Sequence, residues 1–125
     1  MNKFGIIVIV VTILIVGGGA LLITKDNSKP FPTPEPNTYE YFWGDGCPHC
    51  KIVDDFFETW DGKDKIKIKK LEVWNNKSNA SLMAERAKTC GIPLAEMGVP
   101  LLITLEGKCL TGDQQIIEHY KSLKF

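Results

Sequence analysis

Arginine is nearly absent from this chain of 125 residues, because Arg86 is the only one. The chain also has no excess of charge, since fifteen Lys and Arg residues balance fifteen Asp and Glu residues. Nucleic-acid binding normally needs a basic surface and arginine side chains that read phosphates and guanines, so the composition argues against a nucleic-acid partner. The length excludes a multidomain or solenoid protein and leaves room for one small core.

An apolar segment without any charge occupies residues 4–23, where fifteen of the twenty residues are hydrophobic. Twenty helical residues span about 30 Å, the thickness of the hydrocarbon core of a bilayer. We expect a short N-terminal tail at 1–3 and a transmembrane anchor at 4–23, with the N-terminus in the cytoplasm and the remaining chain outside the membrane. The alternative is a cleaved signal peptide with its cleavage site at 18–20, which would release a secreted domain. Hydrophobicity on all faces argues against a buried globular helix.

A proline-rich segment at residues 24–37 follows, with prolines at 30, 32, 34 and 36. Alternating prolines fix φ and remove backbone donors, so this segment favours an extended polyproline-like linker. At ~3.1 Å per residue it would hold the domain about 20 to 25 Å from the membrane. The globular domain is then expected at 38–125.

Hydrophobic periodicity in that domain alternates between strand and helix. We expect strands at 39–43 and 66–73, the second with a slip near residues 69–70, and helices at 47–60 and 80–90. A strand at 99–105, a return strand at 108–110 and a last helix after 113 complete the domain. The order β-α-β-α-β-β-α predicts an α/β fold, in which a right-handed crossover makes the first two strands parallel and a hairpin adds antiparallel strands to the same sheet.

Two cysteines, Cys47 and Cys50, stand where the first strand gives way to a helix. At a helix start, unpaired backbone N–H groups and the positive end of the helix dipole favour a thiolate over a thiol. Pro48 costs nothing in the first helical turn, and a protonated His49 adds further stabilisation of the anion. The spacing places Cys50 one turn further in and more buried. The pair can therefore pass between dithiol and disulfide, with an exposed Cys47 as the attacking sulfur and Cys50 as the resolving one.

Two other interpretations of the pair are an inert disulfide and half of a zinc site. A bridge across two residues closes so short a loop that it adds little stability, which favours exchange over a structural role. A zinc ribbon would need a second closely spaced pair, whereas Cys90 and Cys109 lie far apart in the sequence. We therefore expect no metal and no cofactor beyond the redox-active Cys47–Cys50 disulfide.

At this point the sequence resembles the thioredoxin superfamily, over residues 38–125. The resemblance is carried by Trp43 four positions before the first cysteine, by Cys47-Pro48-His49-Cys50, and by Gly98-Val99-Pro100 at the start of the third strand. It implies a minimal thioredoxin-like fold with a mixed four-stranded sheet flanked by helices. It also implies a cis peptide bond at Pro100 and substrate contacts from Trp43, Val99 and Pro100. The Pro-His dipeptide is similar to that of bacterial periplasmic disulfide oxidases and of small membrane-anchored thioredoxin-like proteins of bacteria.

The sequence departs from this family at several positions. Thioredoxins and the periplasmic oxidases carry a buried acid six residues before the first cysteine, where this chain has Tyr41. Glu40 is adjacent, but one step along a strand changes faces. Asp45 is expected on an exposed loop, where it would oppose thiolate formation. Asp113 is expected as the cap of the last helix.

The second pair of cysteines, Cys90 and Cys109, is expected to form a structural disulfide that pins the loop at 91–98, because an exported protein rarely leaves thiols reduced. The alternatives are two separately buried thiols and a second redox pair that relays electrons.

Together these features predict a bacterial thiol–disulfide oxidoreductase, a monomer that acts outside the cytoplasmic membrane on protein thiols and disulfides and contributes to cell redox homeostasis. An oxidase, which a membrane-bound redox partner would reoxidise, is favoured. The alternatives are a membrane-tethered disulfide reductase and a non-catalytic module that binds a partner or a metal ion through its cysteines.

Overall fold

The computed structural model describes residues 2–22 and 30–125, and the chain divides into two compact units, Met1–Pro30 and Phe31–Phe125. In the first unit, the helix α1 spans Lys3–Leu22, and its side chains are described at residues 3 and 5–13. No helix in the described part of the chain is both long and apolar enough to cross a membrane. The anchor expected at 4–23 is therefore not supported by the structure, and Ile23 and the linker residues 24–29 lie outside the described residues.

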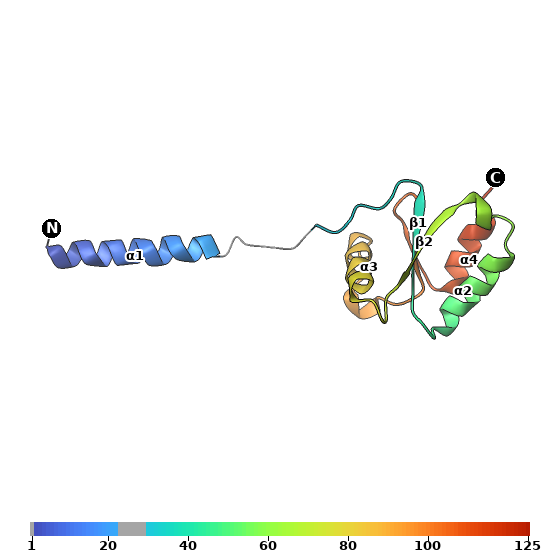
Figure 1. Cartoon of the computed structure of the whole chain (residues 1–125), viewed down its shortest axis with the longest axis horizontal. Helices are drawn as coiled ribbons and strands as arrows, with labels where there is room; N and C mark the ends of the chain where they lie inside the picture. Colours follow the sequence, from blue (N-terminus) through green and yellow to red (C-terminus); the bar gives the residue numbers. More distant parts are fainter. Residues whose placement is uncertain (1, 23–29) are drawn as a thin grey trace. The chain divides into compact units, whose positions relative to one another are not determined.

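The second unit contains one sheet and three α-helices (Figure 1). The elements are β1 (Thr38–Trp43), α2 (Pro48–Thr59), β2 (Lys67–Glu72), α3 (Lys77–Thr89), β3 (Leu101–Ile103), β4 (Cys109–Thr111) and α4 (Asp113–Ser122), with short 3₁₀ turns at Lys63–Lys65 and Leu94–Glu96. The sheet has the order β2-β1-β3-β4. β1 pairs parallel to β2 and antiparallel to β3, which pairs antiparallel to β4. The chain therefore has the predicted α/β fold with a mixed four-stranded sheet flanked by helices.

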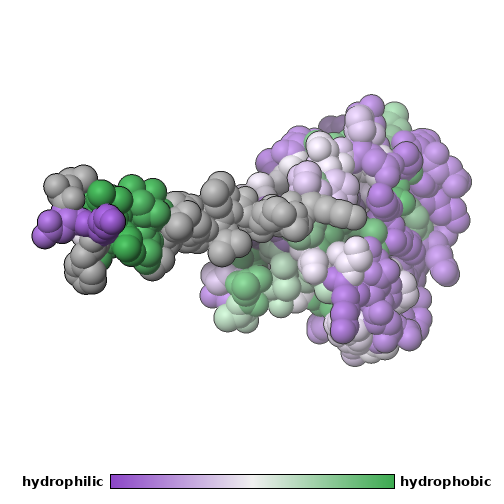
Figure 2. Space-filling model, turned by 60° about the vertical axis from the view of Figure 1, so that its left-hand side comes forward, coloured by the Kyte–Doolittle hydropathy of each residue, from purple (hydrophilic) through white to green (hydrophobic). Residues whose placement is uncertain are grey.

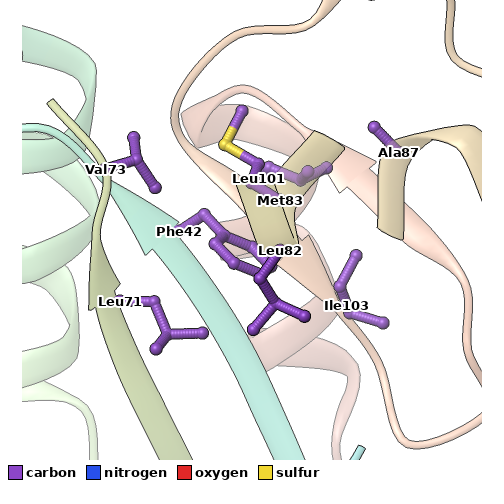
Figure 3. Packing of buried hydrophobic residues seen from close by; sticks show 8 residues of the cluster. All are labelled: Phe42, Leu71, Val73, Leu82, Met83, Ala87, Leu101 and Ile103. Carbon is purple, nitrogen blue, oxygen red and sulfur yellow. The ribbon is translucent and has the colours of Figure 1, made fainter. Parts of the chain in front are cut away.

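The two faces of the sheet carry separate hydrophobic clusters, because side chains alternate along each strand. Helix α3 covers one face, where Phe42, Leu71 and Ile103 meet Leu82 and Ala87 (Figure 3). Helices α2 and α4 cover the other face, as Figure 1 shows. That second cluster consists of Tyr39, Tyr41, Val53, Leu102, Ile116 and Tyr120.

The slip expected in the second strand is wrong. β1 and β2 pair without interruption from Thr38–Lys67 to Trp43–Glu72. Ile66 and Ile68 pack toward the α2 and α4 cluster, whereas Leu71 and Val73 pack toward the α3 cluster. The change of hydrophobic parity in the sequence therefore reflects a regular strand that contributes to both faces.

The segment Phe31–Asn37 belongs to the domain unit, whereas the sequence predicted a linker over all of residues 24–37. Arg86 of α3 donates a hydrogen bond to the Pro32 carbonyl, with Nη2 and O 2.6 Å apart. Glu35 pairs with Lys67 and Lys69 on the edge strand β2. The prolines keep this segment extended, but these contacts fasten it to the domain. On the face drawn in Figure 2, hydrophilic surface surrounds smaller hydrophobic areas of this unit.

Candidate redox site at the start of helix α2

The start of helix α2 carries a disulfide between Cys47 and Cys50, whose Cα atoms lie 5.2 Å apart. Cys47 is the N-cap residue, and its Sγ accepts the backbone N–H of Cys50 at 3.1 Å. A helix N-cap normally uses an oxygen to satisfy one of the unpaired N–H groups of the first turn. Here a sulfur takes that place, so the same N–H would stabilise a Cys47 thiolate once the disulfide is reduced. Pro48 occupies the first turn, where its missing donor costs nothing.

Cys47 is less exposed than the sequence predicted. Its exposed fraction is 7%, against 1% for Cys50, so the expected order holds but both residues are buried. The loop before β3 approaches the sulfur, with the Val99 carbonyl oxygen 3.9 Å from Cys47 Sγ. A hollow of about 340 Å³ nevertheless reaches both cysteines. It is lined by Trp43, Gly44, Gly46, Cys47, Pro48, Cys50, Lys51, Asp54 and Asp55.

The residues expected to contact substrate lie around this disulfide. Trp43 ends β1, is partly buried and lines the hollow. The Val99–Pro100 peptide bond is cis, as the sequence led us to expect. Pro100 is buried, and its carbonyl accepts the Gly112 N–H at 3.0 Å, which ties this loop to the start of α4. The fold therefore brings together the end of β1, the loop before β3 and the start of α4. The substrate roles of Trp43, Val99 and Pro100 stay predictions.

The side chain of His49 contacts the start of helix α4. Its Nδ1 lies 3.0 Å from Oδ1 of Asp113, and 66% of the His49 side chain is exposed. A carboxylate only accepts hydrogen bonds, so His49 donates from Nδ1. The expectation that Asp113 caps α4 is wrong, because Gly112, with a φ of 81°, occupies the cap position and Asp113 is the first helical residue. The side chain of Asp113 instead joins the starts of two helices.

The strand residues Glu40 and Tyr41 lie on opposite faces of the sheet, as strand alternation predicted. Tyr41 lies beneath the site, and its hydroxyl is 3.4 Å from the Cys50 carbonyl oxygen, a long and weak hydrogen bond. Burial, reinforced by the charge of Asp54, raises the pKa of Tyr41 above its ordinary range. Tyr41 is therefore protonated at neutral pH. The site has a neutral hydroxyl on this strand face, where the thioredoxins that the sequence resembles have an acid.

Glu72 is a site residue that the sequence analysis missed. It ends β2, and its carboxylate accepts backbone N–H groups of Trp74, Asn75 and Asp45. Burial raises the pKa of Glu72, but the hydrogen bonds from these backbone N–H groups together lower it below its ordinary value. The carboxylate thereby holds the loop after β2 against the loop that leads into Cys47. Asp45, as expected, is exposed on that loop. The only signal in the sequence was an acidic residue three positions before the polar turn at residues 75–76.

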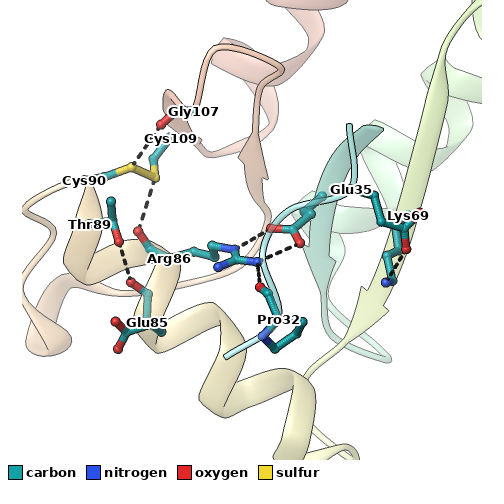
Figure 4. A network of polar contacts seen from close by, with 10 residues as sticks. Pro32, Glu35, Lys69, Glu85, Arg86, Thr89, Cys90, Gly107 and Cys109 are labelled. Carbon is teal, nitrogen blue, oxygen red and sulfur yellow. Dashed lines mark hydrogen bonds and ion pairs between the residues drawn. A yellow bond between two sulfur atoms is a disulfide. The ribbon is translucent and has the colours of Figure 1, made fainter. Parts of the chain in front are cut away.

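The second disulfide joins Cys90 and Cys109, whose Cα atoms lie 6.1 Å apart (Figure 4). Cys90 caps the C-terminal end of α3, and Cys109 begins β4. Both are partly buried, and the bond closes the loop that carries the short helix Leu94–Glu96. This is the pairing that the sequence favoured, and its structural role stays a prediction.

Neither metal ligands nor a matching family add to this site. Among the described residues, no group of three or more His, Cys, Asp and Glu side chains is arranged to hold a metal ion. No family model matches the chain, and no curated protein or solved structure matches it. The disulfide at Cys-x-x-Cys spacing, in a small α/β fold, is compatible with thiol–disulfide redox chemistry.

Proposed function

We propose that the domain is a thiol–disulfide oxidoreductase of the thioredoxin type that uses Cys47 and Cys50, and that it works outside the cytoplasmic membrane. One observation carries the proposal. The Cys47–Cys50 disulfide lies at the N-terminus of α2, where the Cys50 N–H points at Cys47 Sγ from 3.1 Å. An inert bridge gains nothing from that placement, whereas a thiolate that must leave and attack does.

In the oxidase direction, a substrate thiolate attacks Cys47 Sγ, and the Cys47–Cys50 bond breaks. Cys50 leaves as a thiolate and takes up a proton, while the substrate sulfur forms a mixed disulfide with Cys47. A second substrate thiolate then attacks the first substrate sulfur and displaces the Cys47 thiolate. The substrate loses two electrons and two protons. The protein gains the two electrons and one proton, with Cys50 as a thiol and Cys47 as a thiolate, and the other proton goes to the solvent. Another disulfide, of a membrane-bound partner or of oxidised glutathione, accepts those electrons in turn.

The reductase direction runs the same exchanges backward, with Cys47 attacking a substrate disulfide and Cys50 resolving the mixed disulfide. The equilibrium of Cys47 and Cys50 with glutathione separates the two directions. We expect a reduction potential above that of the glutathione couple, because the N-terminus of α2 favours the thiolate and so stabilises the reduced protein. A potential far below that couple would assign the reductase direction.

Two cysteine variants test catalysis. Cys50→Ser retains the attacking sulfur but lacks the resolving one, so it should accumulate mixed disulfides with protein substrates on non-reducing gels. Cys47→Ser should trap none, and both variants should lose dithiol oxidation and insulin reduction. The matched control is Cys90→Ala with Cys109→Ala, which removes the other disulfide and should retain turnover. Unchanged turnover in Cys47→Ser and Cys50→Ser would refute catalysis at this pair.

For location, we propose that the apolar segment at 4–23 tethers the domain to the membrane with the N-terminus in the cytoplasm. The support comes from the sequence, where fifteen of these twenty residues are hydrophobic and none is charged. Membrane fractionation of the tagged chain, with protease accessibility from the outer side, tests this proposal. A shortened protein in the soluble extracytoplasmic fraction would indicate a cleaved signal peptide instead.

A further inference from the structure

Cys50 must gain or lose a proton in the proposed reaction, although its exposed fraction is only 1%. In the oxidase direction its sulfur leaves as a thiolate and takes up a proton. In the reductase direction it loses that proton before it attacks, because the thiolate is the nucleophile. A side chain that accepts and returns protons close to this buried sulfur would accelerate the exchange.

The hollow that reaches Cys50 contains few side chains able to exchange a proton. Within the described part of the chain, the ionisable residues that line it, apart from the cysteines, are Lys51, Asp54 and Asp55. Lys51 and Asp55 pair with each other, because Lys51 Nζ lies 2.7 Å from both carboxylate oxygens of Asp55. Their side chains are 74% and 60% exposed, whereas that of Asp54 is 32% exposed. Asp54 is therefore the ionisable side chain of the hollow that lies nearest the protein interior.

Helix α2 places Asp54 one turn after Cys50 on the same face. Side chains four positions apart in an α-helix are neighbours, with Cβ atoms about 5–6 Å apart. Both residues lie within the helix, and both line the hollow of about 340 Å³. A proton can pass between the carboxylate and the sulfur over such a separation by way of one water molecule.

Contacts with the sheet hold the Asp54 carboxylate at this place. Lys70 of β2 donates to Asp54 Oδ1 at 2.7 Å, and among the described residues no hydrogen bond reaches Oδ2. Lys70 is the register partner of Tyr41, whose hydroxyl lies 3.4 Å from the Cys50 carbonyl oxygen. Burial and then the charge of Asp54 raise the pKa of Tyr41, so this hydroxyl stays protonated and is not itself a proton acceptor. One oxygen of Asp54 is thus fixed, and the other is free to accept a proton.

We propose that Asp54 is the proton-transfer residue for Cys50, which accepts the thiol proton when Cys50 attacks a mixed disulfide and returns it when Cys50 leaves. The proposal rests on the proposed function, because it concerns one step of the same exchange. In the attacking direction, the proton moves from Cys50 Sγ to the carboxylate, and the thiolate then attacks Cys47 Sγ. The Cys47–Cys50 bond forms, the bond from Cys47 to the substrate sulfur breaks, and the substrate leaves as a thiolate. Asp54 then releases the proton to the solvent.

Single-turnover oxidation of the full-length protein measures this step by itself. The protein is reduced under native conditions, mixed with excess oxidised glutathione and quenched with acid at successive times. Cys47 first forms a mixed disulfide with glutathione, and Cys50 then displaces the glutathione. Mass mapping of the peptide that contains Cys47 and Cys50 gives the rates of both steps, whatever the state of Cys90 and Cys109.

Asp54→Asn should slow the second step about a hundredfold at pH 7, the lower end of what general base catalysis contributes. The first step, in which Cys50 takes no part, should change much less. A carboxylate that acted only through its charge would disfavour the Cys50 thiolate, so its removal would accelerate the second step instead. The matched control is Glu58→Gln, which removes an exposed carboxylate of the same helix outside the hollow and should keep both rates.

The pH profile of the second step distinguishes proton transfer from a structural role. In Asp54→Asn the rate should rise about tenfold per pH unit, because the thiolate fraction of Cys50 then depends on the solvent alone. The wild-type rate should rise much less steeply, and Asp54→Glu, which retains a carboxylate, should recover the wild-type profile. The other titratable groups that face Asp54 are Lys70 from β2, Tyr41 from β1, Tyr120 from α4 and Lys51 of α2.

Asp54→Ala gives a second measurement, because the space that it leaves in the hollow admits a small carboxylate. Added acetate should accelerate the second step in this variant and have no effect on the wild type. Failure of oxidised glutathione to react at Cys47 would overturn both this proposal and the proposed function. A second step that is equally fast or faster in Asp54→Asn would overturn the role of Asp54 alone. A slow second step that neither Asp54→Glu nor acetate restores would show a structural role and would also overturn it.

Discussion

At the scale of single residues, His49 and Asp113 form a hydrogen-bonded pair at the start of the helix that Cys47 caps. The histidine sits in the first turn of α2, and its carboxylate partner starts α4, with 3.0 Å between Nδ1 and Oδ1. A protonated histidine favours a nearby thiolate and a carboxylate opposes it, so we expect the two side chains to act on a Cys47 thiolate in opposite directions.

Replacing His49 and replacing Asp113 should therefore shift the reduction potential of Cys47 and Cys50 in opposite directions. His49→Gln removes a side chain that favours the thiolate when it is protonated, and should lower the potential. Asp113→Asn removes the anion and should raise it. We expect each change to alter the glutathione equilibrium constant about two- to tenfold, where tenfold is about 30 mV. Shifts of the same sign in both variants would contradict this account.

Arg86 contributes to stability at the same scale, because it neutralises the buried carboxylate of Glu40. Its Nε lies 2.7 Å from Oε2 of Glu40, and its Nη2 also reaches Oε1 at 3.1 Å. Only 12% of the Arg86 side chain and 5% of the Glu40 side chain are exposed. Arg86→Met should lower the free energy of unfolding by about 3 kcal/mol, because it leaves a buried charge without a partner.

The double variant, Glu40→Met with Arg86→Met, should be more stable than Arg86→Met alone, since no charge is then left unpaired. Urea unfolding with both disulfides intact measures the three proteins. A double variant that is the least stable of the three would show that the pair contributes net stability beyond mutual neutralisation.

At the scale of elements, the Cys90–Cys109 disulfide fastens the end of α3 to β4. The two cysteines are 19 positions apart, so the bond closes a loop whose entropy in the unfolded chain corresponds to about 3 kcal/mol. Cys90→Ala with Cys109→Ala should lower the free energy of unfolding by about that amount. It should leave the equilibrium constant of Cys47 and Cys50 with glutathione unchanged. A change in that constant would favour the interpretation of Cys90 and Cys109 as a second redox pair that relays electrons.

Glu72 connects two loops, and its effect on stability depends on pH. Its pKa in the folded protein lies below the ordinary value of 4.5, so its contribution is present above that value and is lost as the pH falls through the folded value. Glu72→Gln should therefore lower the melting temperature at pH 7, and the difference from wild type should narrow below about pH 4.5. Melting curves between pH 7 and 3 measure this, and a constant difference would contradict it.

At the scale of the whole molecule, the segment Phe31–Asn37 joins the domain through Arg86 and Glu35. We expect a fragment of residues 31–125 to melt at a higher temperature than a fragment of residues 38–125. The bond from Arg86 to the Pro32 carbonyl should provide most of the difference, because the Glu35 pairs are exposed and worth little. A loss of about 1 kcal/mol corresponds to roughly 4–8 °C in a domain of this size. Glu35→Ala in the longer fragment is the control and should change its melting temperature little.

Local sequence features predicted the order of the elements and the position of the Cys47–Cys50 pair well. The aromatic strand at 39–43, the helix that follows Cys47 and the glycine after Cys90 depend on propensity, capping and periodicity, which act over a few residues. The opposite faces of Glu40 and Tyr41 followed from strand alternation alone. The prediction of a slip at residues 69–70 was wrong. A shift in the alternation of apolar residues along the sequence does not distinguish a bulge from an edge strand that packs on both faces.

What the sequence by itself determined is therefore the α/β order, the position of the cysteine pair at a helix start and the charge of the chain. Only the tertiary structure decided that Asp113 meets His49, that Arg86 holds Glu40 and Pro32, and that Lys70 pairs with Asp54 at the hollow that reaches the cysteines. These partners are separated by up to 64 residues. Contacts at such separations depend on how the sheet brings loops together, and no local pattern in the chain records that arrangement.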